Sequence, residues 1–269
     1  DHPDTLTTRN NLAGAYDSAG RFGEAIELFE QVLADRVRVL GPDHPDTLAA
    51  RNNLAGAYED VGRFGEAIEL YKRVLDDRVR VLGSDHPDTL TARNNLAGAY
   101  DSAGRFGEAI ELYERVLFER ERVLGSDHPD TLITRNNLAG AYHSVGRFGE
   151  AIELFERVLA EQERVLGSDH PDTLTTRNNL AVAYHSAGHF GEAIELYERV
   201  LAEQERVLGP DHPDTLTTRN NLASAYRSVG RFGEAIELYK RVLDDRVRVL
   251  GPDHPDTLTT RNNLAGAYD

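Results

Sequence analysis

A histidine lies between two aspartates in the segment Asp-His-Pro-Asp at residues 169–172. Imidazole and carboxylate groups bind metals and act as general acids and bases, so this combination of residue types could do chemistry. The same segment, followed by Thr-Leu, begins at residues 1, 43, 85, 127, 169, 211 and 253. Seven copies of one catalytic site are not what an enzyme needs. Their constant spacing of 42 residues is therefore the more informative observation.

The copies belong to a repeat that fills the whole sequence of 269 residues. A fixed period of this size predicts a solenoid or array of repeats. We therefore expect residues 1–269 to form a single array, and we expect the sequence to be a piece of a longer protein. The repeats are 1–42, 43–84, 85–126, 127–168, 169–210 and 211–252, with a partial repeat at 253–269 that holds only a first helix.

Each repeat contains two segments whose apolar residues recur at steps of three, four and seven. This spacing is typical of amphipathic helices, and a sustained alternation of period two, which would indicate strands, does not occur. In the first repeat we predict helices at about 3–18 and 22–40. Gly20 and Gly41 follow them and provide the left-handed residue that often ends a helix. The sequence thus predicts an all-α fold made of antiparallel helix hairpins.

The Asp-His-Pro-Asp segment falls at the start of the first helix of each repeat. In the second repeat Asp43 is the predicted N-cap, Pro45 lies in the first turn, and Asp46 follows three residues after the cap. Both carboxylates would lie at the positive end of the helix dipole. Adjacent residues do not share a helix face, and copies in neighbouring repeats lie too far apart for one metal ion. We interpret the segment as a capping motif, and we predict no catalytic residue, no metal site and no cofactor.

Composition excludes further classes of function. The sequence has 30 basic and 46 acidic residues, a net charge of −16, and no visible basic patch, so we do not expect it to bind nucleic acid. Apolar runs are too short to span a membrane. There is no cysteine and therefore no disulfide framework or thiolate metal site. We expect a soluble, cytoplasmic protein.

Three short patterns in each repeat resemble the tetratricopeptide repeat (TPR) family: Leu12-Ala13-x-x-Tyr16, Gly20-x-Phe22 and Ala25-x-x-x-Phe29. Two features differ from the family pattern, because Arg9 stands where the family has tryptophan and the proline after the second helix is absent. Eight extra residues at 34–41 lengthen the usual 34-residue repeat to 42. This longer form is similar to the repeats of kinesin light chains and of related arrays in bacterial signalling proteins.

The resemblance implies a right-handed superhelical solenoid in which the first helix of each repeat lines a concave groove that binds a peptide or protein segment. In the family, asparagine side chains on that helix hold the ligand backbone. An amide offers both a donor and an acceptor, as an extended backbone requires. The alternative is that one asparagine of each pair bonds the neighbouring repeat and only fixes the stacking. The corresponding residues are Asn10, Asn11, Asn52, Asn53, Asn94, Asn95, Asn136, Asn137, Asn178, Asn179, Asn220 and Asn221, with Asn262 and Asn263 in the partial repeat.

One position near the end of the first helix changes charge from repeat to repeat. We predict a groove that is acidic over the first three repeats and neutral to basic over the next three. Such a groove would orient a peptide with its basic end toward repeats one to three. The alternative is a solvated helix face with scattered charge. The residues at this position are Asp17, Glu59, Asp101, His143, His185 and Arg227.

These patterns predict a non-catalytic scaffold for protein–protein interaction that binds its ligand in the concave groove. The alternative is a structural spacer or self-assembly module that stacks end to end and has no specific groove ligand. The partial repeat bears on this choice, because its helix at 255–268 has no second helix to cover Leu264 and Tyr268. We expect this end to be frayed or to self-associate.

Overall fold

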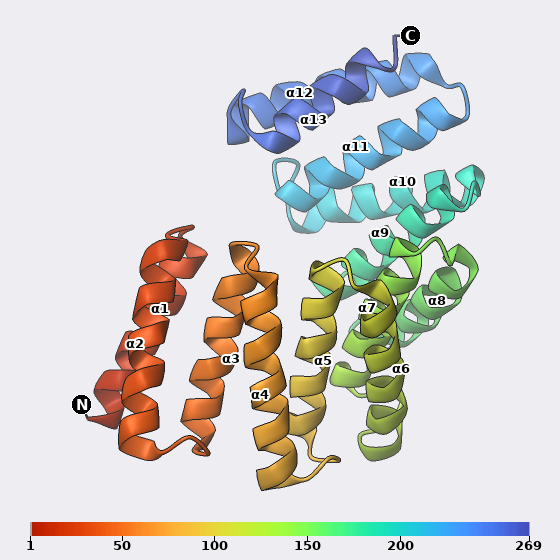
Figure 1. Ribbon diagram of the computed structural model, residues 1–269. Helices are drawn as coiled ribbons and strands as arrows, with labels where there is room; N and C mark the ends of the chain where they lie inside the picture. The colour runs from red at the N-terminus through yellow and green to blue at the C-terminus, as the bar shows by residue number, and fades with distance from the viewer. Residues whose placement is uncertain (1, 269) are drawn as a thin grey trace. The chain divides into compact units, whose positions relative to one another are not determined.

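The computed structural model describes residues 2–268, and the regular elements among them are all α-helices (Figure 1). This confirms the predicted all-α fold. The bounds in the first repeat, Pro3–Ser18 and Phe22–Leu40, agree with the two predicted helices. The helices are α1 (Pro3–Ser18), α2 (Phe22–Leu40), α3 (Pro45–Asp60), α4 (Phe64–Leu82), α5 (Pro87–Ser102), α6 (Phe106–Val123), α7 (Pro129–Ser144), α8 (Phe148–Val165), α9 (Pro171–Ser186), α10 (Phe190–Val207), α11 (Pro213–Ser228), α12 (Phe232–Leu250) and α13 (Pro255–Ala265).

The chain divides into two compact units, Asp1–Ala141 and Tyr142–Asp269, with the boundary inside α7. In the first unit α1 to α6 pack in chain order, each helix against the next. The second unit repeats the arrangement from α8 to α13. Each unit is therefore a stack of helix hairpins, as Figure 1 shows for α1 to α6 and for α8 to α13. The prediction that residues 1–269 form one array stays a prediction.

Small and large apolar residues alternate in the core between the helices. Ala13 and Ala25 are fully buried, which lets α1 and α2 approach closely, and Phe29 and Val32 fill the space beside them. The same combination recurs in the second unit, where Tyr197 packs within one cluster of buried residues from α9, α10 and α11. Burial of one such large apolar side chain contributes about 1.5–3 kcal/mol. Gly20 and Gly41 end their helices with φ angles of +72° and +90°, as predicted.

A buried arginine occupies the position at which the TPR family has tryptophan. In α11 the Arg219 side chain is 1% exposed, and it donates to Asp245 at 2.9 Å and to Glu205 at 2.6 Å. These acids lie on α12 and α10, so one guanidinium joins the second helix of its own repeat to that of the preceding repeat. Arg177 makes the equivalent contacts to Glu203 and Glu163. Sequence analysis did not anticipate this ion-pair network.

The last helix is shorter than predicted, because α13 ends at Ala265 and not at residue 268. Tyr268 is 60% exposed, as expected for an aromatic ring without a covering helix. Leu264 is only partly exposed, because it packs against the cluster that contains Tyr239 and Ala267. Tyr268 is thus uncovered and Leu264 is partly covered, and fraying or self-association of this end stays a prediction.

Candidate functional site

The N-cap of the first helix is the histidine of the Asp-His-Pro-Asp segment, so the prediction for Asp43 was wrong. His44 has extended backbone angles, and its Nδ1 accepts a hydrogen bond from the backbone N–H of Asp46 at 3.2 Å. Pro45 occupies the first helical position, and the residue before it must be extended, which makes His44 the cap. The same contact, at 3.2–3.3 Å, is made by His2, His86, His128, His170, His212 and His254.

The first aspartate of the segment forms an ion pair and does not cap the helix. Asp43 accepts two hydrogen bonds from Arg80 near the end of α4, one of them at 2.8 Å. Arg80 holds the pKa of Asp43 below its usual range, so the carboxylate stays charged. The segment thus ties the start of the first helix to the end of the second helix of its repeat. Within residues 2–268, no group of three or more acidic or histidine side chains could hold a metal ion.

Loss of the histidine cap should cost a modest amount of stability. We expect His86→Ala to lower the free energy of unfolding by about 1 kcal/mol, since one N–H at the start of α5 loses its acceptor. His86→Asn provides a carbonyl oxygen in place of the ring nitrogen and should cost little. Urea denaturation of both variants measures the difference. Equal losses in the two variants would show that the imidazole acts by packing and not as a cap.

The asparagine pairs form hydrogen bonds between neighbouring repeats. Asn53 donates to Asn10 at 3.3 Å, and Asn95 donates to Asn52 at 2.9 Å. In other repeats a threonine is the donor, as in the bond from Thr134 to Asn94 at 3.1 Å. The first asparagine of a pair therefore accepts from the next repeat and fixes the stacking. A contact between the same amides and a ligand stays a prediction.

The pairs differ in how far they are exposed. Asn11 is exposed, and the second asparagine of each later full repeat is partly buried: Asn53, Asn95, Asn137, Asn179 and Asn221. Among the first asparagines, Asn94 and Asn220 are buried, and the others are partly buried: Asn10, Asn52, Asn136 and Asn178.

The charge-changing position is partly buried in all six repeats and forms contacts inside each unit. Glu59 accepts a hydrogen bond from the Tyr71 hydroxyl at 2.8 Å, and burial raises the pKa of its carboxyl group. His143 and His185 contact Ser186 and Ser228 of the following repeat at 2.9 and 3.0 Å. Burial lowers the pKa of both histidines. These side chains are therefore not a freely solvated row.

Asp17 and Asp101 differ from this pattern because each has one buried carboxylate oxygen without a hydrogen-bond partner. Burial raises the pKa of both carboxyl groups, and at Asp17 the neighbouring Asp60 raises the pKa further. The remaining member, Arg227, lies beside Gly266, where an added Cβ atom would be 2.9 Å from its Nη1 atom.

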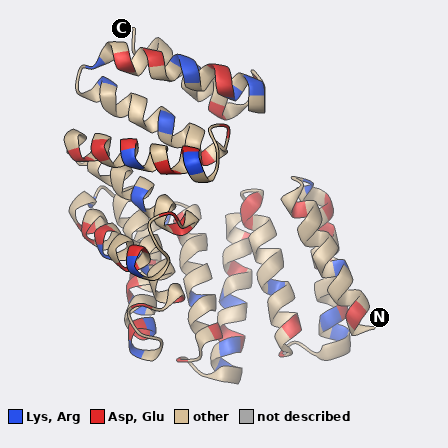
Figure 2. Ribbon diagram, turned by 180° about the vertical axis from the view of Figure 1, so that it is seen from behind, with Lys and Arg blue, Asp and Glu red and all other residues tan. Residues whose placement is uncertain are grey.

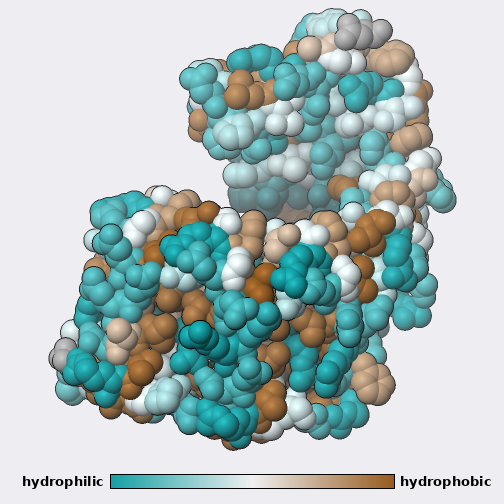
Figure 3. All heavy atoms as spheres, viewed as in Figure 1, coloured by the Kyte–Doolittle hydropathy of each residue, from teal (hydrophilic) through white to brown (hydrophobic). Residues whose placement is uncertain are grey.

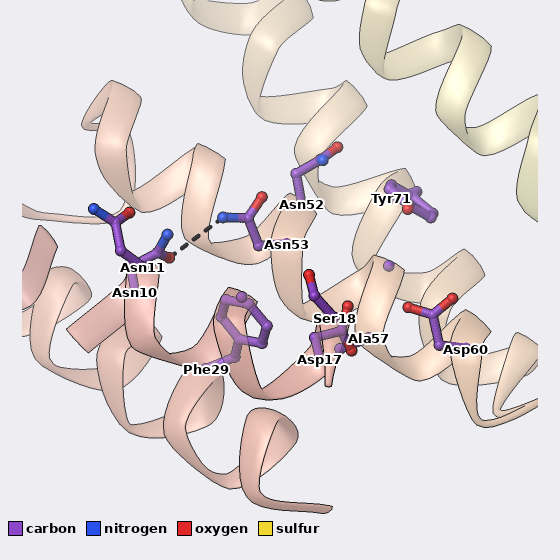
Figure 4. A pocket seen from close by; sticks show the side chains of 12 residues that line it. Asn10, Asn11, Asp17, Ser18, Phe29, Asn52, Asn53, Ala57, Asp60 and Tyr71 are labelled. Atoms are coloured by element: carbon purple, nitrogen blue, oxygen red, sulfur yellow. Dashed lines mark hydrogen bonds between the residues drawn. The ribbon is translucent and has the colours of Figure 1, made fainter. Parts of the chain in front are cut away.

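A cavity of about 560 Å³ lies over the first two repeats (Figure 4). It brings together two asparagine pairs and Asp17, all of which were predicted site residues. The structure adds Asp60 and the rings of Phe29 and Tyr71 from the second helices. Serine occupies the position of Asp60 in the other five full repeats, so a comparison between repeats distinguishes Asp60 in the sequence. The lining residues are Asn10, Asn11, Gly14, Asp17, Ser18, Phe29, Asn52, Asn53, Gly56, Ala57, Asp60 and Tyr71.

Charged residues of both signs are interspersed along the helices (Figure 2), so the net charge of −16 is not gathered on a single helix. The face seen in Figure 3 likewise mixes hydrophobic and hydrophilic residues. Among the described residues, no helix is both long enough and apolar enough to span a bilayer.

The Tetratricopeptide repeat profile matches residues 4–78, 50–117, 119–160, 136–202, 190–246 and 229–269. The chain belongs to the tetratricopeptide repeat family. TPR proteins generally mediate protein–protein interactions, and the TPR fold is generally non-catalytic. Solenoid proteins of this kind present extended concave surfaces to their partners.

Similar proteins place the chain among the kinesin light chain-like TPR proteins. One similar structure contains TPR-like repeats, themselves nearly identical to one another, from a kinesin light chain candidate of Podosopora anserina. This chain is 40% identical to it in sequence, and the TM-score is 0.65 over 77% of this chain and 98% of that chain. BtubC (BKLC) from P. vanneervenii is 24% identical, with a TM-score of 0.68 over 95% of each chain, and shares the fold. Protein KINESIN LIGHT CHAIN-RELATED 2 of Arabidopsis thaliana is 52% identical over 40 residues, which are 15% of this TPR chain and 6% of the plant protein.

Proposed function

We propose that this TPR chain is a non-catalytic scaffold that binds an extended peptide or protein segment along its first helices. The observation that supports this most strongly is the 560 Å³ cavity over α1 and α3, which is lined by four asparagine amides. Asn11 is exposed there. The amides of Asn10 and Asn53 bond each other, but an amide has two donor hydrogens and two acceptor lone pairs. One inter-repeat bond therefore leaves capacity for a ligand backbone.

The two aspartates of the cavity favour a ligand with a basic residue at this end. Burial and the nearby Asp60 both raise the pKa of Asp17, so the folded protein holds two carboxylates in an unfavourable arrangement. An ammonium or guanidinium group between them would relieve the repulsion and give Asp17 a hydrogen-bond partner. In the equivalent contacts of the second unit, a histidine meets a serine. We therefore propose that the basic end of the ligand lies at the first two repeats.

A peptide-library screen on the parent chain and on Asp60→Ser tests both parts of the proposal. Serine is the residue of the other five full repeats at this position, so the variant should fold. We expect the parent to retain peptides with lysine or arginine, and Asp60→Ser to bind them about tenfold more weakly at low salt, as the loss of one charge-assisted hydrogen bond implies. Asp76→Ala is the matched control, because it removes an exposed carboxylate of α4 that does not line the cavity.

Two outcomes would contradict the proposal. Equal weakening by Asp60→Ser and Asp76→Ala would mean that only the net charge matters. A folded parent chain that retains no peptide would exclude groove binding by short segments and favour the second candidate, a self-assembly module. That candidate is supported by the exposed Leu258 and Tyr268 on the last helix and beyond it, which could pack against another copy.

A further inference from the structure

A second cavity, of about 300 Å³, lies in the first unit and shares no lining residue with the 560 Å³ cavity over the first two repeats. It is formed where the start of α3, the end of α4 and the start of α5 meet. Its walls are mainly apolar, with Arg78 as the one basic residue. The lining residues are Asp43, Pro45, Asp46, Leu48, Ala49, Arg78, Val81, Leu82 and Asp88.

Two of the three arginines equivalent to Arg78 have a full set of hydrogen-bond acceptors, whereas Arg36 in the first repeat donates to the backbone oxygen of Asp46. In the third repeat, Arg120 donates from Nη1 to the backbone oxygen of Asp130 and to the Thr134 hydroxyl, both at 2.7 Å. Its Nη2 donates to the Thr91 hydroxyl at 3.1 Å. Arg246 makes the same three bonds in the sixth repeat, at 2.7–3.3 Å, to Asp256 and two threonines. Both arginines are buried, and two threonine hydroxyls hold each guanidinium group.

Arg78 lacks both hydroxyl partners because Ala49 and Ala92 stand at the two threonine positions. It keeps the bond to the backbone oxygen of Asp88 at 2.7 Å. Its side chain is only partly buried, unlike Arg120 and Arg246, yet burial still lowers the pKa of its guanidinium. The cavity thus lies beside a desolvated cation at the place where a threonine hydroxyl is missing.

The apolar walls and the surrounding charges limit what can fill this space. Leu48 is buried, whereas Val81 and Leu82 expose part of their side chains. The Asp43 carboxylate is paired with Arg80, but Asp46 and Asp88 also line the cavity and would repel an anion. The Arg78 guanidinium would repel a cation. A neutral group with an acceptor oxygen satisfies both constraints.

We propose that this cavity is a binding site for a small neutral molecule that has an apolar body and one hydrogen-bond acceptor. The acceptor takes the place of the missing threonine hydroxyl at Arg78, and the apolar body packs on Leu48, Val81 and Leu82. Ligand sites typically have this character, in which apolar walls surround a few fixed polar groups. The site is independent of the groove and of the function proposed for it.

Cyclopentanone is a suitable probe, because it has one acceptor, no donor and a compact apolar ring. We expect it to shift the NMR signals of the Ala49 methyl group and the Arg78 side chain, with a dissociation constant on the order of millimolar for so small a ligand. Ala49→Thr restores the residue that Thr91 and Thr217 provide in other repeats, so the variant should fold. It should bind the probe at least about tenfold more weakly, since the hydroxyl competes for the same donor.

The double variant Thr217→Ala/Thr260→Ala provides the reciprocal control. It should open the same kind of space beside Arg246 and produce a second probe site with shifts at that arginine. Equal binding of the probe to the parent and to Ala49→Thr would overturn the proposal. Absence of any probe-induced shift at Ala49 and Arg78 in the folded parent would also overturn it and would leave a cavity that holds only water. Neither result affects the peptide screen, because Asp60 does not line this cavity.

Discussion

Replacement of Arg219 by methionine is expected to lower the stability of the second unit by about 2–4 kcal/mol. Removal of one partner from a buried ion pair typically costs about 3–5 kcal/mol, because the other charge remains buried and unpaired. Here Glu205, which is 38% exposed, would lose its partner, whereas Asp245 would keep its ion pair with Arg248 at 3.0 Å. Water would partly solvate Glu205, and both effects reduce the loss. Methionine fills much of the same volume, which limits any contribution from an empty cavity.

Urea denaturation gives the overall loss, and hydrogen exchange of the α11 amides localises it, since repeat arrays need not unfold in one step. Arg9→Met is the matched control. Arg9 has the equivalent partner, Asp35 at 3.0 Å, but its side chain is 31% exposed, and we expect a loss below about 1 kcal/mol. Addition of Glu205→Val to Arg219→Met should restore part of the stability, since valine occurs at this position in other repeats, as at Val37. A loss for Arg219→Met as small as that for Arg9→Met would contradict the assignment.

The arginine network also shows where sequence reasoning was limited. The partners of Arg219 lie 14 residues before it and 26 residues after it, so no local pattern connects them. Only a comparison between repeats indicates which acids could pair with Arg219. Glutamate stands at the position of Glu205 in repeats three to five, and valine stands there in the other full repeats. The helix hairpins, in contrast, follow from the spacing of apolar residues within 20 positions and could be predicted almost to the residue.

The start of the first helix was predictable, but its capping residue was not. Asp43 and His44 both have side chains that accept hydrogen bonds. The choice between them depends on which residue has extended backbone angles directly before the helix, and the position of Pro45 decides this. The prediction placed the cap at Asp43, one residue too early. It therefore did not include the pairing of Asp43 with Arg80, which lies 37 residues away.

The proposed groove residues were named from the resemblance to the TPR family, and their contacts within the chain depend on the neighbouring repeat. Asn10 bonds Asn53 of the second repeat, and His143 contacts Ser186 of the fifth. Side chains that fix the stacking can thus belong to the same row as those proposed to meet a ligand. Binding of a ligand that competes for these groups would therefore also affect the stacking of the hairpins. Single substitutions on the inner face therefore need a matched stability measurement before a loss of binding is assigned to a lost contact.

The second prediction with a large expected effect compares two equivalent leucines at the start of the first helix. Leu216 in α11 is 1% exposed, whereas Leu258 in α13 is 41% exposed. We expect Leu216→Ala to cost about 3 kcal/mol, because it removes buried apolar surface and leaves a cavity between packed helices. Leu258→Ala should cost less than about 1 kcal/mol, since much of its side chain already contacts water. Urea denaturation of both variants measures the difference.

Leu174→Ala is the control within the same unit, because Leu174 is as buried as Leu216 and should lose a similar amount of stability. The comparison separates two causes of stability in a repeat. The leucines have the same neighbours in sequence, from the capping histidine to the asparagine pair, so local helix propensity is the same at all three positions. Any difference must come from the second helix that covers α9 and α11 but does not follow α13 within the described residues. Equal losses at Leu216 and Leu258 would mean that local structure, and not the covering helix, determines the stability of a hairpin.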